Sequence, residues 1–327
     1  MTDNRFIVSS SPHIRSDETI SSIMLDVIIA LSPAFIAGAY FFGYRAILIT
    51  LVSIISCVAA EYIWQKTCKK PITISDWSAV VTGMLLAFNM PVTVPLWMPV
   101  IGGFFAIIIV KQFFGGLGHN FMNPALAARA FLLASWPGAM TKWVQPFEKI
   151  SLFGNVDAVS SATPLAIIKG TEAVEQAVPG YWQLFFGQIG GCIGETSAIA
   201  LLLGAAYLLY RRVINWRIPV TFIATVGLFT FIFGKDGLFT GDALYHILSG
   251  GLILGAFFMA TDYVSSPVTP KGQVIMGIGC GIITSIIRLY GGYPEGVSYS
   301  ILLMNVLTPL IDKYTMPVKF GEVKARA

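Results

Sequence analysis

The chain has 327 residues, of which 55% are hydrophobic and only 12% are charged, and its mean hydropathy is +0.74. A single water-soluble globule cannot enclose this much apolar surface, so the composition predicts a protein that lies in a lipid bilayer. The net charge of +4 is small. Its basic residues are spread over loops, which argues against a DNA-reading element and predicts no nucleic-acid partner.

Long apolar runs recur along the chain, and a helix needs about 17 to 25 residues to cross a bilayer. The runs are continuous and do not alternate, so they predict helices and not barrel strands, in an all-α polytopic membrane protein with about ten transmembrane helices. The third, fifth and tenth runs are short, which predicts broken or partly re-entrant helices. The expected spans are 23–42, 46–64, 77–90, 96–114, 124–135, 189–210, 218–233, 243–259, 274–290 and 298–311.

The distribution of basic residues predicts the orientation. The first 20 residues are polar and lack an apolar core, so we expect no cleavable signal peptide, and the first span is the expected insertion signal. With both termini in the cytoplasm, most Lys and Arg residues lie on the cytoplasmic side, as the positive-inside rule requires. The basic residues then expected outside are Arg45, Lys142, Lys149, Lys169, Lys235 and Arg288.

This orientation divides the chain into five regions. A cytoplasmic arm covers residues 1–22 and a cytoplasmic tail covers residues 313–327. Two membrane units cover residues 23–135 and 188–312. The segment 136–187 between them is the one substantial polar stretch, and the odd number of preceding spans predicts that it is an extracytoplasmic loop. Polar loops of this length often carry function.

The two membrane units resemble each other in sequence. The string AFNM at 87–90 is echoed by AFFM at 256–259, and IGGFFAIIIVKQFFGG at 101–116 by IGCGIITSIIRLYGG at 278–292, which aligns Lys111 with Arg288. A unit of five spans is odd-numbered, so its second copy begins on the opposite side of the membrane. The echoes predict two inverted five-helix repeats, an arrangement found in transporters. Small residues that favour close helix packing can also produce such echoes, which leaves the repeat open.

Within the polar segment, DAVSSATPLAIIKG at 157–170 places Ser160, Ser161 and Thr163 before Pro164. The structural interpretation is a helix start, with a hydroxyl as N-cap and proline at the first helical position. The functional interpretation is a hydroxyl that carries a covalent group. That chemistry needs an oxygen nucleophile in an exposed loop that a modifying enzyme can reach.

The string resembles the flavin attachment motif of the D subunit of Rnf electron-transport complexes and of the B subunit of sodium-translocating NADH:quinone reductases. Four further segments are similar to the Rnf D subunit and occur in its order, and the short, Rnf-like length without a long N-terminal extension favours the Rnf family member. These segments are SSPHIRSDETISSIMLDV at 10–27, NPALAARAF at 123–131, GETSA at 194–198 and YPEGVSYSILLMN at 293–305.

The resemblance implies a cofactor and partners. In these families FMN is esterified through its phosphate to the threonine that corresponds to Thr163, by a flavin transferase, and the flavin supplies the redox chemistry. It also implies a prokaryotic cytoplasmic (inner) membrane and other Rnf subunits, which include a second covalent-FMN subunit and subunits with iron–sulfur clusters and the NAD site. Such a complex couples electron flow between ferredoxin and NAD to sodium or proton translocation.

A second flavin is implied near NPALAARAF. Asn123 before Pro124 is an N-cap followed by an N1 proline, so a plain helix start is one interpretation. Similar family members hold a non-covalent riboflavin in this region, and the free N–H groups of a helix start would suit a flavin. Asn120 and Asn123 are the candidate hydrogen-bonding residues. Arg129 would either offset flavin charge or pair with a carboxylate, and we favour the pairing.

Other charged residues within or near spans are also candidates, because ionisable groups are costly in a bilayer. We consider Asp26, Glu61 and Glu195 as partners of Arg129 or as groups of an ion pathway, with Glu61 and Glu195 close enough to span ends to be solvated. Asp262 is expected to be a loop or cap residue. A flavin-free channel or transporter for a small solute remains the alternative function, and an assembly scaffold without redox work is a third.

Overall fold

The computed structural model describes residues 18–148, 162–170, 178–234, 237–293 and 295–317. This part of the chain is mostly helical, which confirms the all-α prediction. Its one sheet is a hairpin of two residues per strand, in which β1 (Phe233–Gly234) pairs with antiparallel β2 (Gly237–Leu238).

Three helices of the described residues are long and apolar enough to cross a membrane by length and composition. They are α1 (Ile20–Phe42), α2 (Tyr44–Thr67) and α13 (Pro270–Tyr290). A capping box formed by Thr19 and Ser22 fixes the start of α1. Gly43 separates α1 from α2 with a φ of 70°, a conformation that glycine adopts without strain.

The other helices are shorter. The larger ones are α3 (Ser78–Phe88), α4 (Trp97–Phe104) with its π-helical continuation η2 (Phe105–Gln112), α5 (Pro124–Ser135), α9 (Ala198–Tyr210), α10 (Arg217–Ile232) and α14 (Val297–Thr315). The remaining pieces are η1 (Ile74–Asp76), α6 (Pro137–Met140), α7 (Pro164–Lys169), α8 (Tyr181–Phe186), α11 (Ala243–Leu248), α12 (Leu252–Leu254) and the π-helical η3 (Gly255–Met259).

The expected spans match these helices only in part. The third and fifth are short, as predicted, with 11 residues in α3 and 12 in α5. The tenth is not short, because α14 has 19 residues. The sixth begins at Ala198 and not at 189, because a glycine-rich stretch precedes it, and the eighth is broken into α11, α12 and η3. The number of crossings and the inverted repeats stay predictions.

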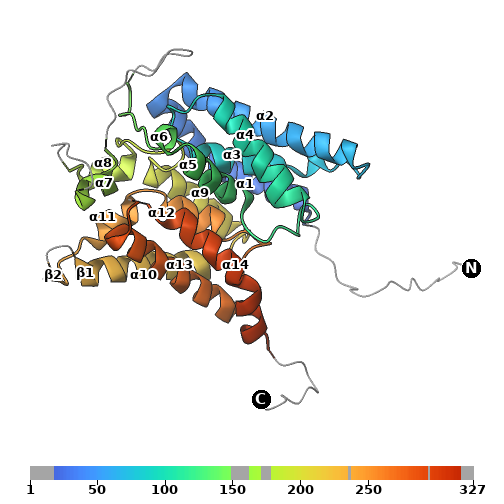
Figure 1. Cartoon of the computed structure of the whole chain (residues 1–327). Coiled ribbons are helices and arrows are strands. Elements are labelled where there is room, and N and C mark those ends of the chain that lie inside the picture. Colours follow the sequence, from blue (N-terminus) through green and yellow to red (C-terminus); the bar gives the residue numbers. More distant parts are fainter. Residues whose placement is uncertain (1–17, 149–161, 171–177, 235–236, 294, 318–327) are drawn as a thin grey trace, which may run out of the picture.

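Close helix packing organises the bundle. In Figure 1, α1 to α4 lie towards one side of the bundle, α10, α13 and α14 lie towards the other, and α5 and α9 lie between them. α2 packs against α3 and α4, α10 packs against α11 and α13, and α1 packs against α9. At Gly204 in α9, a Cβ atom would stand 1.9 Å from the carbonyl oxygen of Ala30 in α1. Only glycine therefore permits this approach of α1 and α9.

The two echoing strings meet inside the bundle. Asn89 and Met259, which belong to AFNM and AFFM, are both buried, and the Asn89 amide donates to the Met259 sulfur at 3.6 Å. The Asn123 amide donates to the Met259 carbonyl at 3.3 Å. The ends of α3 and η3 and the start of α5 thus come together at one point in the core. Broken helices that meet inside a membrane bundle form binding sites in many transporters.

Candidate functional site

Arg129 lies at the centre of a buried polar cluster. Its guanidinium pairs with Glu295 at 2.6 Å, donates through Nε to the Asn89 carbonyl at 3.2 Å and makes a short hydrogen bond to the Ser298 hydroxyl. The prediction of a structural ion pair is confirmed. The partner is Glu295, which was not among the expected partners because it precedes the tenth expected span. Both side chains are only 10% exposed, so the pair is held away from water.

Asp26, Glu61 and Glu195 do not pair with Arg129 in this structure. Asp26 in α1 pairs with Arg211 at 3.1 Å and accepts from the Tyr207 hydroxyl at 2.7 Å, which joins α1 to the end of α9. Glu195 accepts from the Cys192 N–H at 2.9 Å within its own loop. The expected solvation of Glu61 and Glu195 is wrong, because they are 1% and 5% exposed.

Thr163 is the N-cap of α7, as the structural interpretation predicts. Its hydroxyl accepts from the Ala166 N–H at 3.2 Å, and Pro164 occupies the first helical position. The expectation of an exposed hydroxyl is wrong in this structure, because Thr163 is 3% exposed. Ser160 and Ser161 lie outside the described residues, so their predicted roles stay predictions.

A small cavity, here called the Thr163 cavity, lies beside this threonine. Its volume is about 10 Å³, and its walls include Gly191, Glu195, Gly250 and Glu295. Glu295 therefore contacts both this cavity and Arg129. Sites for drug-sized ligands occupy about 300 to 1,000 Å³. The Thr163 cavity has room for about one water molecule, so a cofactor esterified to Thr163 would have to lie outside it.

A larger cavity, the Asn123 cavity, lies between α1, α3, α5, α9 and η3. It encloses about 110 Å³, which is below the size range of small-ligand sites. Its polar wall residues include Asn120, Asn123, Lys111 and Asp262, and most of the wall is apolar. Desolvation raises the pKa of Asp262, although hydrogen bonds from Ser265, Val264 and Asn120 lower it. The structure thus brings Asn120 and Asn123 together on one cavity, as predicted.

The start of α5 does not offer the free N–H groups expected for a flavin site. The Asn123 Oδ1 atom accepts from the N–H groups of Ala125 and Leu126 at 3.0 and 3.2 Å, and Pro124 has no N–H. The cap therefore satisfies the donors that a flavin would need. Asn123 retains one amide hydrogen beyond its bond to Met259, and Asn120 retains its carbonyl oxygen.

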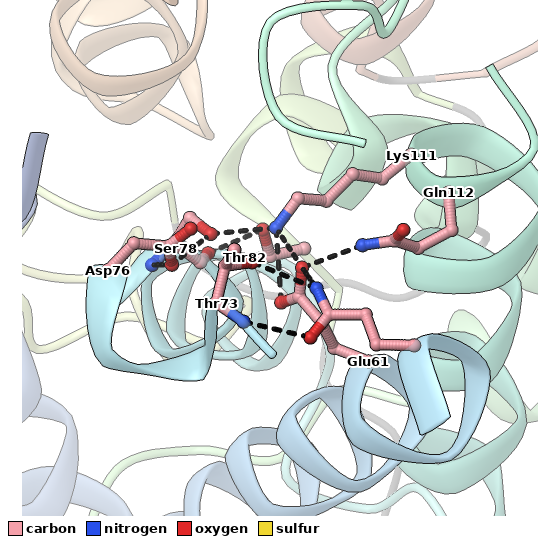
Figure 2. A network of polar contacts seen from close by, with 8 residues as sticks. Glu61, Thr73, Asp76, Ser78, Thr82, Lys111 and Gln112 are labelled. Carbon is pink, nitrogen blue, oxygen red and sulfur yellow. Dashed lines mark hydrogen bonds and ion pairs between the residues drawn. The ribbon is translucent and has the colours of Figure 1, made fainter. Parts of the chain in front are cut away.

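A second buried ion pair borders the Asn123 cavity (Figure 2). Lys111 in η2 donates to both carboxylate oxygens of Glu61, at 2.8 and 3.1 Å, and to the Ser78 hydroxyl at 2.7 Å. The amide of Gln112 donates to Glu61 at 2.7 Å and that of Gln65 at 3.4 Å. Lys111 is 2% exposed and Glu61 is 1% exposed. The π-helical turn thus directs adjacent Lys111 and Gln112 side chains toward one carboxylate, and π-helical turns are frequent at functional sites.

A continuous set of polar contacts links the two cavities. Glu295, a wall of the Thr163 cavity, pairs with Arg129, which donates to the Asn89 carbonyl. The side chain of Asn89 reaches Met259, and Met259 accepts from Asn123, a wall of the Asn123 cavity. Along α5, Asn123 and Arg129 are six residues apart, which corresponds to about 9 Å at 1.5 Å per residue.

Asp262 lies in the loop after η3 and accepts from the Ser265 hydroxyl at 2.8 Å, so its prediction as a loop residue is confirmed. Among the described residues, no group of three or more His, Cys, Asp or Glu side chains could hold a metal ion. The four cysteines are free, and three are buried.

Comparison with known proteins places the chain among membrane electron-transport subunits. Residues 7–321 match the model of the NQR2, RnfD, RnfE family. The chain is 54% identical to the D subunit of the Na(+)-translocating ferredoxin:NAD(+) oxidoreductase complex of Acetobacterium woodii, over 100% of this chain and 98% of the relative. It is 52% identical to the D subunit of the proton-translocating ferredoxin:NAD(+) oxidoreductase complex of Clostridium ljungdahlii, over 97% of each chain. It is 36% identical to the D subunit of the ion-translocating oxidoreductase complex of Halorhodospira halophila, over 97% of this chain and 96% of the relative.

Proposed function

Because this chain belongs to the NQR2, RnfD, RnfE family, we propose that it is the D subunit of an ion-translocating ferredoxin:NAD oxidoreductase complex and carries electrons across the membrane. In this proposal FMN is joined to Thr163 by a phosphoester, and a second flavin binds in the Asn123 cavity. The chain completes no reaction alone. Its partners are the other Rnf subunits, which include a second covalent-FMN subunit and the iron–sulfur and NAD-binding subunits.

The position of Thr163 is the observation that carries the proposal. Pro164 and the N-cap geometry fix the hydroxyl at the start of α7, where it lines the Thr163 cavity. Glu195 and Glu295 disfavour an anion there, whereas Arg129 is paired with one of the two carboxylates and offsets its charge. A phosphoester would hold the flavin in place while its ring lies outside the Thr163 cavity.

The Asn123 cavity supports the second flavin. Its mostly apolar wall suits an isoalloxazine ring, and its volume of about 110 Å³ requires the surrounding helices to move apart when the ring enters. The remaining Asn123 N–H and the Asn120 carbonyl would orient its polar edge, whereas the charge of Lys111 is already paired with Glu61. Arg129 does not contact this cavity. Its proposed role is structural, because its ion pair with Glu295 joins α5 to the loop before α14, between the two sites.

The proposed topology gives the two sites opposite depths. If both termini are cytoplasmic, α7 lies on the outer side and the loop between η2 and α5 lies towards the cytoplasm. The two cavities are linked through the Arg129 cluster, so electrons would pass between flavins held on opposite sides of the core. The coupling ion does not follow from similarity, because two relatives of 54% and 52% identity are named for sodium and for protons.

Burial of Thr163 determines when the flavin can be attached. Since the residue is 3% exposed, the proposal requires that the flavin transferase act before α7 packs against the loop at 187–197. We expect strong labelling when the transferase is present during synthesis. Adding it later to the folded, unmodified protein should give labelling at least about tenfold slower, because local opening then limits the reaction.

In-gel fluorescence of the denatured protein tests the attachment site. The wild type and Thr163→Ser should fluoresce when made with the flavin transferase, because both present a hydroxyl at the N-cap. Thr163→Val should be dark, although its shape is almost unchanged. Fluorescence that survives in Thr163→Val would exclude Thr163 as the attachment site, and a dark wild type would favour the flavin-free transporter.

A further inference from the structure

Buried polar atoms without partners cluster around Arg288. Among the described residues, seven buried polar side-chain atoms have no hydrogen-bond partner, and four of them belong to Tyr245, His246, Ser249 and Arg288. These residues come from the α11 region and from the end of α13. Buried polar groups are almost always hydrogen-bonded, so such a cluster points to a ligand or solvent that satisfies them.

Two of these side chains face a large cavity, here called the Arg288 cavity. It measures about 580 Å³ and is walled by α7, by the ends of α10 and α13 and by the start of α11. Its polar wall includes His246 and Arg288, which are 8% and 3% exposed, and the Nδ1 atom of His246 and the Nε atom of Arg288 have no partner. Lys169 at the end of α7 adds a third basic group to the wall.

Arg288 has no direct ion pair of the kind that Lys111 has, although the carboxylates of Glu295 and Glu195 lie near enough to act on its charge. Lys111, its counterpart in the sequence echo, is paired with Glu61 at 2.8 Å. The guanidinium of Arg288 instead donates to the backbone carbonyls of His246 and Ser249, and none of the ion pairs within the described ranges includes it. A buried arginine with a free Nε–H suits an anionic oxygen, above all a phosphate.

The cavity wall also includes Asp242, whose carboxylate accepts from the Tyr245 N–H at 3.0 Å and from the Tyr181 hydroxyl. Much of the remaining wall is apolar and reaches the surface of the bundle. Leu165 and Ile168 line it from α7, and Leu289 lines it from α13. Two further wall residues, Phe233 and Tyr290, are 39% and 73% exposed, so the cavity opens on an aromatic edge. Aromatic residues of this kind favour the boundary between lipid and water. The cavity therefore has a basic floor and an apolar mouth.

We propose that the Arg288 cavity binds a phospholipid, with the phosphate on Arg288 and His246 and the acyl chain along Leu289 and Phe233. Basic pockets between membrane helices bind anionic headgroups. The flavin proposed at Thr163 is a less suitable occupant. Leu165 lines both the Arg288 and the Thr163 cavities, so α7 stands between them, and the hydroxyl of Thr163 faces the other one.

Native mass spectrometry of the full-length protein in detergent, supplied with phosphatidylglycerol, tests the site. Wild-type protein should retain a bound lipid. We expect about tenfold weaker retention in Arg288→Gln, which removes the phosphate ligand. Leu289→Trp should weaken retention to a similar degree, because it fills the apolar wall without touching the basic groups. It keeps the test decisive if Arg288→Gln does not fold.

Three control variants show whether lipid retention depends on this cavity. Ile286 lies on α13 like Leu289, but it is 48% exposed and outside the cavity wall, so Ile286→Trp should retain lipid. Lys313→Gln removes an exposed cation on α14 and should also retain lipid. Thr163→Val should also retain it, whether or not the wild type carries a flavin. Equal retention in wild type and Arg288→Gln would overturn the site. Loss of lipid retention in Thr163→Val would also overturn the site, because it would assign the cavity to the flavin. Displacement of the lipid by equimolar inorganic phosphate would overturn it as well, because it would show that the lipid tail contributes nothing.

Discussion

Breaking the buried pair of Glu61 and Lys111 should destabilise the protein strongly. The two side chains are 1% and 2% exposed, so removal of one partner leaves the other charge buried without its counter-charge. Single removals of this kind cost about 3 to 5 kcal/mol. In a chain of this size a loss of 1 kcal/mol lowers the melting temperature by about 2 °C, so we expect a decrease of about 6 to 10 °C.

The two single variants should not be equal. In Lys111→Met the carboxylate of Glu61 still accepts from Gln112 and Gln65. In Glu61→Gln the ammonium group keeps only the Ser78 hydroxyl and a neutral amide. Glu61→Gln should therefore be the less stable single variant, and the double variant should recover at least about 1 kcal/mol relative to the sum of the single losses.

Thermal unfolding of the purified protein in one detergent measures these effects, with Lys313→Met as a control that removes an exposed lysine. The control should melt within about 1 °C of the wild type, because exposed charges contribute little. Single variants that melt like the control would refute the reasoning that the pair is held away from water. Strict additivity in the double variant would refute the coupling.

Two further predictions concern helix contacts. Asn123→Ala removes the cap of α5 and the hydrogen bond to Met259, and should lower the free energy of unfolding by about 1 to 2 kcal/mol. Asn123→Asp keeps the capping oxygen, so it should lose less stability in the same melting assay. An Asn123→Ala variant that melts like the wild type would contradict the role of the cap. Gly204→Ala places a methyl group 1.9 Å from the Ala30 carbonyl oxygen. It should lower the free energy of unfolding by about 1 to 3 kcal/mol, because it forces α1 away from α9. The matched control is Gly180→Ala, which has nothing within 4 Å of its Cβ position and should melt like the wild type.

Local sequence signals predicted the parts of the fold that depend on neighbours in the chain. Asn123 with Pro124 and Thr163 with Pro164 both mark helix starts, and both do so in the structure. The shortness of α3 and α5 was also visible in their apolar runs. The breaks in the eighth span were not visible in the sequence, because Gly250, Gly251 and Gly255 interrupt a run that remains apolar throughout. Hydropathy does not distinguish a straight apolar helix from a broken one.

The polar cluster depends on contacts between residues distant in sequence, which periodicity cannot reveal. Arg129 and Glu295 are separated by 166 positions, and Glu295 sits in a loop before α14. The burial of Glu61 and Glu195 was likewise missed, since proximity to a predicted span end suggested solvation. The YPEGVSYS string contains the one local indication that Glu295 is paired, because a carboxylate beside an apolar helix start needs a cation. It could not identify which cation.

Covalent attachment of FMN to Thr163 is best tested by the mass of the tryptic peptide that contains this residue, taken from the assembled and active complex. We expect a peptide heavier by one FMN less one water, with fragmentation that places the addition on Thr163. A peptide of unmodified mass in active material would contradict the attachment, and the electrons would then need another route through this chain.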